Sequence, residues 1–189
     1  MNKDQAYLVV DTETGGLNPR KNSILSIAGV VWEPKKSITP IFDFYICEPK
    51  INYIDKAMEI NRIDLEDVKN GLKPFEAVQE IKRSLNKYFG HARQPIMLVG
   101  HNINFDIAFI KRLYRLAKLE YYIDFRNRAL DTAGILEFLM ISGKIEGDRA
   151  SADVLFEATN TKIREEDRHT AKGDAIATAT AIDTLTLTI

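Results

Sequence analysis

Two carboxylates, Asp11 and Glu13, are separated by a single residue and follow directly after the apolar run Tyr7–Val10. This run is typical of a short buried strand, and side chains two residues apart in a strand point to the same side. We therefore expect the two carboxylates to share one face at the end of this strand. Two neighbouring carboxylates that lose hydration and repel each other require a counter-charge.

Three further residues could complete such a site. Asp106 stands in the stretch GHNINFD, and His169 and Asp174 stand in the stretch RHTAKGD. Considered alone, Asp174 is more simply interpreted as the N-terminal residue of an alanine-rich helix. Together, about four negative charges in one crevice are tolerable mainly when two divalent ions, Mg²⁺ or Mn²⁺, neutralise them. Oxygen ligands favour these hard ions over zinc.

The spacing of apolar residues predicts the elements that must position these side chains. Strands are expected at 7–10, 24–32, 38–47, 95–100 and 128–130, with 24–32 and 38–47 forming a hairpin. Helices are expected at 73–89, at 105–119, from residue 131, at 151–159 and at 173–189. The expected apolar faces of the first two helices consist of Phe75, Val78, Leu85 and Phe89, and of Phe109, Leu113, Leu116 and Ala117.

This order of elements predicts an α/β fold, in which a mixed β-sheet is covered by helices on both faces. If the strand that ends at Asp11 runs parallel to the strand that ends at Gly100, their C-terminal ends open into one crevice. The loop after Gly100 then brings Asp106 to the first two carboxylates. A length of 189 residues is suited to a single domain, expected to span 1–189.

Composition excludes several classes of protein without identifying a partner. The net charge of −1 does not by itself indicate nucleic-acid binding. The single cysteine, Cys47, excludes an internal disulfide framework. No apolar run is long enough to cross a bilayer, and the N-terminus has no basic segment followed by a long apolar one. We therefore expect no membrane association and a cytoplasmic location.

Three stretches, DTETGGL, GHNINFD and HTAKGD, resemble in this order the exonuclease motifs of the DnaQ-like DEDDh superfamily. This superfamily includes the proofreading subunit of bacterial DNA polymerase III and ribonuclease T. The resemblance runs from about residue 7 to the C-terminus and implies a ribonuclease H-like sheet, two divalent metal ions and hydrolysis from the 3′ end of a nucleic acid. His169 lies five residues before Asp174, as in the histidine type, whereas the tyrosine type would require a tyrosine at Thr170.

The resemblance also implies roles for individual residues. Asp11 is expected to contact both ions, Glu13 and Asp174 to complete the first ion site, and Asp106 to complete the second. His169 is expected to take a proton from the attacking water. The implied substrate is a single-stranded 3′ end, and a DNA polymerase or replication complex is a candidate partner.

The terminal nucleotide is expected to contact residues of the first two motifs: Thr14, Gly15, Leu17, Asn102 and Phe105. Leu17 occupies the position that wedges against the terminal base, while Gly15 and Gly16 would let backbone amides approach the nucleotide. Phe105 could equally be a core residue, and Asn102 could brace its own loop. The chain departs from the family at Gly15, which is usually threonine, and at Ile60–Asp64, where many members have a His-Gly pair.

Several features have simpler structural interpretations. His91 is expected at the surface after a helix, and His101 is expected to be structural. The basic residues Lys111, Arg112, Arg115 and Lys118 are interpreted as the solvated face of their helix. Two alternative functions are considered for the same residues, a non-catalytic binding module and a phosphatase of the DxDxT type. The phosphatase needs an aspartate at the position of Glu13 and has no use for His169. The choice between DNA and RNA and the oligomeric state stay open.

Overall fold

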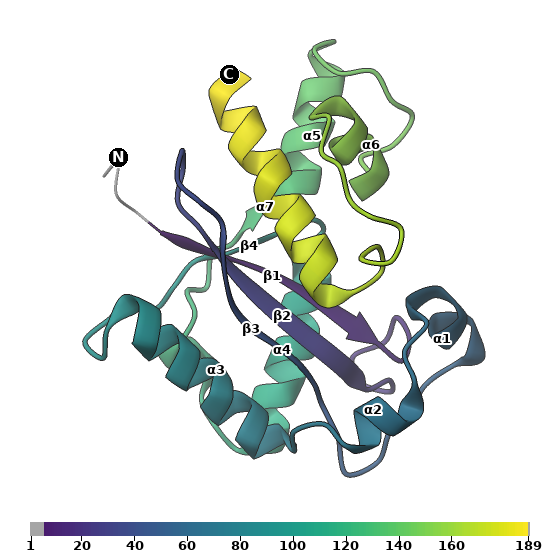
Figure 1. The fold of residues 1–189 in the computed structure, drawn as a ribbon, viewed down its shortest axis with the longest axis vertical. Helices are drawn as coiled ribbons and strands as arrows, with labels where there is room; N and C mark the ends of the chain where they lie inside the picture. Colours follow the sequence, from purple (N-terminus) through teal and green to yellow (C-terminus); the bar gives the residue numbers. More distant parts are fainter. Residues whose placement is uncertain (1–5, 189) are drawn as a thin grey trace.

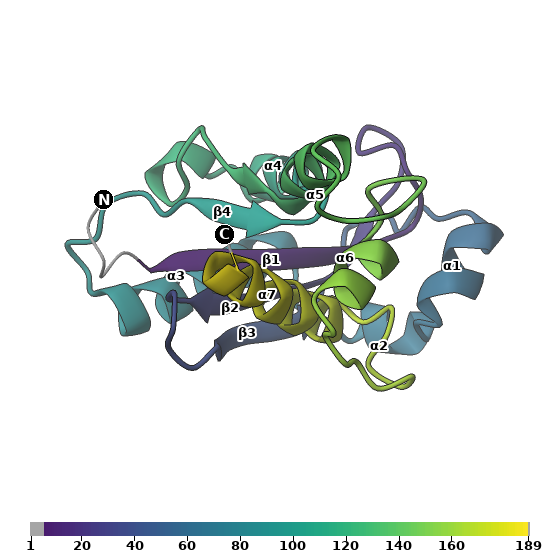
Figure 2. The same cartoon turned by 90° about the horizontal axis from the view of Figure 1, so that it is seen from above.

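The computed structural model describes residues 6–188, and its centre is a mixed β-sheet (Figures 1 and 2). The sheet order is β3-β2-β1-β4-β5. The strands are β1 (Tyr7–Thr14), β2 (Ile24–Trp32), β3 (Thr39–Tyr45), β4 (Leu98–Gly100) and β5 (Leu130–Asp131). β1, β2 and β3 pair antiparallel, whereas β1, β4 and β5 pair parallel. The predicted hairpin is confirmed, and the parallel pairing of the first and fourth strands, on which the expected position of Asp106 depended, is present.

The central strand β1 is longer than its apolar run. It continues through both carboxylates, with Asp11 paired to Ala28 and Glu13 paired to Ser26. The sequence prediction that the strand ends at Asp11 was therefore wrong. The ladder with β2 provides hydrogen-bond partners for the backbone, so the strand continues although its side chains are no longer apolar. Both carboxylates are consequently held on rigid backbone.

Helices cover both faces of the sheet, as predicted. α3 (Pro74–Phe89) and α4 (Asn104–Ala117) pack on the face that presents Leu8 and Val10. α7 (Ala171–Thr188) crosses the opposite face, in front of β1 and β2 in Figure 1. Ala175, Ala179 and Ile182 of α7 are buried against Val9 and its neighbours. Because alanine side chains are small, α7 approaches the sheet closely beside Asp11 and Glu13.

A third apolar cluster joins α7 to α5 (Thr132–Ile141) and α6 (Ala152–Ala158). Two residues of the predicted apolar faces do not belong to any core. The side chain of Phe75 is 55% exposed and that of Leu116 is 38% exposed. In α3 the buried stripe instead includes Ala77 and Ile81, so the stripe was placed slightly too far around the helix.

The span between β3 and α3 contains two short helices that the sequence analysis did not predict. α1 covers Asp55–Asn61 and α2 covers Leu65–Lys69. The Asp64 side chain caps α2 by accepting a hydrogen bond from the backbone N–H of Glu66 at 2.9 Å. A short 3-10 turn, η1, covers Tyr121–Ile123. Among the helices of the described part of the chain, none combines the length and apolarity needed to cross a membrane.

Candidate active site

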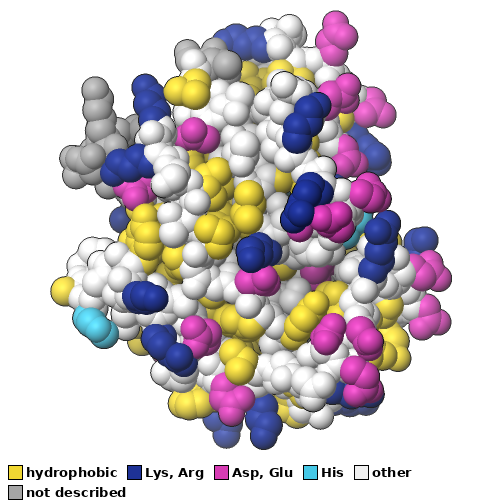
Figure 3. Space-filling model, viewed as in Figure 1, with side chains coloured by type: hydrophobic (Ala, Val, Ile, Leu, Met, Phe, Trp, Pro, Cys, Tyr) yellow, Lys and Arg dark blue, Asp and Glu magenta, His cyan; other side chains and the backbone are white. Residues whose placement is uncertain are grey.

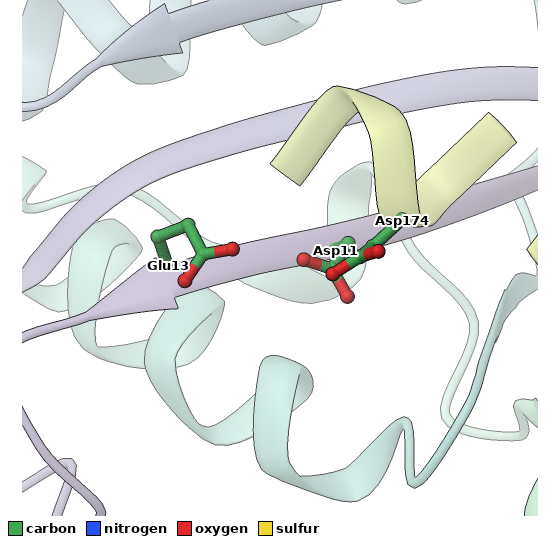
Figure 4. A group of neighbouring side chains, drawn as sticks. All are labelled: Asp11, Glu13 and Asp174. Atoms are coloured by element: carbon green, nitrogen blue, oxygen red, sulfur yellow. The ribbon is translucent and has the colours of Figure 1, made fainter. Parts of the chain in front are cut away.

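Three carboxylates converge where β1 passes beneath the N-terminal end of α7. Asp11 and Glu13 come from β1 and Asp174 comes from the first turn of α7, and their side chains point toward one another in Figure 4. One carboxylate oxygen from each lies within 4.8 Å of the others. The prediction that Asp11 and Glu13 share a face is confirmed, because alternation along β1 directs both toward α7.

Asp106 lies beside this group but is not one of its three members. It stands in the first turn of α4 and is 4% exposed. Its Oδ1 accepts hydrogen bonds from the Thr12 backbone N–H at 2.9 Å and from the Thr12 hydroxyl at 2.7 Å. Its negative charge contributes to raising the pKa of Asp11 and of Glu13, so the four acids form one electrostatic unit.

Burial makes the four acids hold protons unusually tightly, and repulsion by the other acids adds to this effect at Asp11 and Glu13. Burial is the largest cause in each case: it raises the pKa of Glu13 to about 8, that of Asp106 to about 7, and that of Asp11 well above its usual value. The pKa of Asp174 is raised in the same way. Hard oxygen ligands that are crowded, repel one another and retain protons near neutral pH suit a divalent cation, which would supply the missing positive charge.

The structure identifies one counter-charge that the sequence analysis missed, the guanidinium of Arg168. Its Nη1 lies 2.6 Å from Asp174 Oδ1 and its Nη2 lies 2.7 Å from Asp153 Oδ1. The guanidinium also lies over the Phe156 ring, 5.4 Å from its centroid. Its charge opposes part of the rise that burial causes in the pKa values of Asp174 and Glu13. The only signal for it in the sequence is weak, namely a basic residue next to His169.

His169 lies at the wall of a groove of about 760 Å³ that also includes Glu13, Tyr45 and Asn61. It is half-buried, and its backbone has a φ of 62° in the left-handed region, which is uncommon for a residue other than glycine. A hydrogen bond from its backbone to Asp174 opposes part of the rise that burial causes in the pKa of Asp174. His169 thus lies close to the acids in two ways: its backbone bonds to Asp174, and the residue shares a groove wall with Glu13.

The predicted nucleotide contacts differ in their availability. Leu17 is 82% exposed at the tip of the 15–23 loop. Asn102 is exposed, and its backbone N–H donates to Asp131 Oδ1 at 2.8 Å. Phe105 packs on Phe109 with ring centroids 5.0 Å apart, so it is at least partly a core residue.

The backbone amide of Gly15, which was expected to lie near the nucleotide, already has a hydrogen-bond partner. The Gly15 N–H donates to the Ser23 carbonyl at 2.8 Å and is therefore not available to a nucleotide. A Cβ atom at Gly15 would lie 2.4 Å from the Asn52 carbonyl oxygen. Glycine is needed here because two backbone segments approach closely. Thr14 is also engaged, since its hydroxyl donates to the Gly16 carbonyl at 2.9 Å.

Acidic and basic side chains are interspersed on the face that presents α7, β3 and α2, without a patch of one sign (Figure 3). The other histidines do not join the candidate site. His101 hydrogen-bonds through Nδ1 to the Thr132 hydroxyl and through Nε2 to the Ala150 carbonyl, both at 3.0 Å, which supports a structural role. His91 is exposed in the turn after α3, as expected.

Comparison with known proteins identifies the family. A family model described as an exonuclease matches residues 8–182. The chain belongs to this exonuclease family. Relatives include a 3′-5′ DNA exonuclease, Cap18, from Escherichia coli, which is 32% identical over 114 residues, covering 59% of this chain and 58% of that protein. Ribonuclease T from Photorhabdus laumondii is 33% identical over 112 residues, covering 54% and 51%.

A third relative matches this chain over nearly its whole length. A DNA polymerase III subunit epsilon-like protein from Rhodobacter capsulatus is 32% identical over 185 residues, covering 93% of this chain but 23% of that protein. This chain thus spans less than two thirds of the length of each of these relatives. The crystal structure of E. coli exonuclease I with a dT13 oligonucleotide shares the fold, with a TM-score of 0.77 at 17% identity over 97% of this chain and 41% of that one. The predicted ribonuclease H-like fold is confirmed, and membership of this family excludes the phosphatase alternative.

Raising the pH should destabilise this chain when divalent cations are removed. Unfolded carboxyl groups have pKa values near 4, so between about pH 4 and 8 the folded state binds more protons and the free energy of unfolding falls as pH rises. We expect a loss on the order of a few kcal/mol, because each unit of pKa shift corresponds to about 1.4 kcal/mol. Urea denaturation in a chelator at pH 5 and pH 8 measures this loss.

The Asp11→Asn variant is the control for this measurement, since it removes one of the repelling charges. The free energy of unfolding of this variant should depend less steeply on pH than that of the wild type. Adding Mg²⁺ to the wild type at pH 8 should restore the stability that it loses in the chelator. If the free energy of unfolding fell with pH equally steeply in the wild type and in the variant, the acid cluster would not be the cause of the destabilisation.

Proposed function

We propose that this exonuclease degrades single-stranded DNA from the 3′ end and releases nucleoside monophosphates. The observation that supports this most directly is the convergence of Asp11, Glu13 and Asp174 beside a groove whose wall includes His169. The fourth acid, Asp106, is adjacent and buried. A non-catalytic binding module would have no need for this set of repelling acids, whose crowding is costly without a bound cation.

The four acids are the proposed ligands of two divalent ions, Mg²⁺ or Mn²⁺. When bound, such ions activate a water molecule and stabilise the leaving 3′ oxygen. The chain itself would hold the acids in position before the ions bind. Thr12 does this for Asp106 through two hydrogen bonds, and the β1 ladder does it for Asp11 and Glu13.

His169 is the proposed general base. It would accept a proton from the attacking water as a new P–O bond forms and the bond from phosphorus to the 3′ oxygen breaks, and the leaving 3′ oxygen would take a proton from solvent water. The products are a nucleoside 5′-monophosphate and a strand with a new 3′ hydroxyl. Its half-buried position in the groove gives water and a phosphodiester access to the ring. Leu17, on an exposed loop tip, would contact the terminal base.

DNA is the proposed substrate because two of the compared relatives are named as a DNA exonuclease and as a DNA polymerase III subunit epsilon-like protein. RNA trimming is the second candidate, and the similarity to ribonuclease T favours it. A DNA polymerase or replication complex is a proposed partner, since segments of larger polymerase III proteins match this chain, including 11% of a PolC-type protein from Clostridium perfringens. We further propose that 1–189 forms one domain and acts in the cytoplasm.

Digestion of end-labelled strands tests the proposed function. Single-stranded DNA and RNA of matched sequence, each labelled at the 5′ end, should be incubated in Mg²⁺ and in Mn²⁺. We expect products that shorten progressively from the 3′ end, faster cutting of DNA than of RNA, and slower cutting of blunt duplexes because opening a terminal pair costs a few kcal/mol. Shortening from the 5′ end, or cutting of circular single strands as fast as linear ones, would contradict the proposal.

A further inference from the structure

The 15–23 loop is held by a buried ion pair that the sequence analysis did not predict. Arg112 of α4 binds Glu48 through two parallel contacts, Nε to Oε1 at 2.8 Å and Nη2 to Oε2 at 2.6 Å. Its Nη1 also donates to the Pro19 carbonyl at 3.2 Å. Glu48 in turn accepts a hydrogen bond from the Ser23 hydroxyl at 2.8 Å. We call these four residues the loop brace.

Within the loop brace, Arg112 is largely buried and does not belong to the solvated face of α4. The interpretation of Arg112 as a surface residue was therefore wrong. The Arg112 side chain is 15% exposed and the Glu48 side chain is 1% exposed. Removing two charges from water is costly, and it is compensated only where the geometry is good and the remaining hydrogen-bonding atoms are satisfied. The bidentate arrangement and the contacts to Ser23 and Pro19 meet this requirement.

The loop brace connects the exposed tip of the loop to the helix of Asp106. Where the loop leaves and rejoins the fold it is fixed by backbone hydrogen bonds, such as Gly15 N–H to Ser23 O at 2.8 Å. Within the described part of the chain, the Arg112–Pro19 bond is the hydrogen bond that joins residues 17–22 to another element. Since Asp106 lies on the same helix as Arg112, the brace sets the position of Leu17 relative to that acid.

From this geometry we propose that Arg112 is a positioning residue, which holds Leu17 where it meets the terminal nucleotide. This inference rests on the proposed function. Arg112 does not belong to the acid cluster and acts through the loop. Loss of Arg112 should therefore weaken the binding of a polynucleotide 3′ end and make a duplex end harder to open. The hydrolytic step itself should be retained.

The test compares Arg112→Lys with the wild type and with the control variant Arg115→Lys, which changes an exposed residue of the same helix. Lysine keeps the charge but cannot form the bidentate contact. The KM for single-stranded DNA should rise and blunt-duplex cutting should fall, each by between about 10- and 100-fold, as expected for a misplaced contact. The kcat on a nitrophenyl ester of thymidine monophosphate, which reports hydrolysis alone, should stay within about twofold, because the groups that act in hydrolysis are unchanged.

Two further measurements separate positioning from a general loss of structure. Trypsin cleaves after Arg20 and Lys21, so Arg112→Lys should accelerate cleavage within the loop without changing the cleavage of α7. Adding Arg112→Lys to Leu17→Ala should cause no further loss, because residues that act as one unit are not additive. Fully additive losses, or equal losses on all three substrates, would overturn the inference.

The outcomes also distinguish this inference from the proposed function. A wild type that cuts none of the three substrates would contradict the proposed function and this inference together. A wild type that cuts all three, with an Arg112→Lys variant of unchanged KM and unchanged trypsin sensitivity, would overturn this inference alone. If Arg112→Lys fails to fold, Glu48→Asp provides the same test, because it keeps the charge and shortens the reach to Arg112.

Discussion

Asp11→Asn should reduce nuclease activity by at least about 10³-fold while making the chelated protein more stable. Asparagine keeps the shape of aspartate but removes a charge from the centre of the acid cluster, and charge stabilisation of several kcal/mol by bound cations depends on that charge. In the protein without cations, the same charge is repelled by Glu13, Asp106 and Asp174. Loss of activity combined with a gain in stability cannot result from misfolding.

Steady-state digestion in saturating Mg²⁺ and thermal unfolding in a chelator measure the two effects. Asp148→Asn is the matched control, because it makes the same chemical change at an exposed position in the turn region after α5 and should alter neither quantity. Chelation of the wild type should abolish activity, and added Mg²⁺ or Mn²⁺ should restore it. An Asp11→Asn variant with wild-type turnover would show that the cluster does not act in hydrolysis.

The fold was largely predictable because its strongest signals are local. The alternation of side chains along a strand placed Asp11 and Glu13 on one face, and the apolar runs located the hairpin. The short helices α1 and α2 were not predicted, because elements of this length have little apolar periodicity and depend on tertiary contacts. The Asp64 cap, followed by two acidic residues, was the one usable signal for α2.

Local signals do not identify pairs of residues that meet only in the folded chain. Arg112 and Glu48 are 64 residues apart, and each alone resembles an ordinary surface residue. Arg168 is next to His169 in the sequence, in the turn before α7, yet its partner Asp153 belongs to α6. Its contact with Phe156 likewise needs α6 packed beside this turn. Buried ion pairs of this kind depend on which surfaces the tertiary fold brings together, and no single-sequence pattern specifies that.

His169→Gly should reduce turnover by about 10²–10⁴-fold, the usual contribution of a general base. Glycine is the informative replacement, because it removes the imidazole and also fits the left-handed backbone at this position. The variant should therefore be at least as stable as the wild type, and it should still bind Mn²⁺ and single-stranded DNA. His91→Gly, at an exposed histidine after α3, is the matched control and should retain full turnover.

A pH profile alone would not assign this loss to the imidazole. The pKa of Glu13 is raised to about 8 and that of Asp106 to about 7, so the acids change charge in the same range in which histidines do. Rescue by added imidazole separates the two, because a small base can enter the space that His169→Gly leaves in the groove wall but cannot replace a lost carboxylate. Turnover of His169→Gly should rise with imidazole concentration, while Asp11→Asn should not respond. If His169→Gly keeps wild-type turnover without imidazole, another group accepts the proton, and His169 serves the site through its backbone hydrogen bond to Asp174.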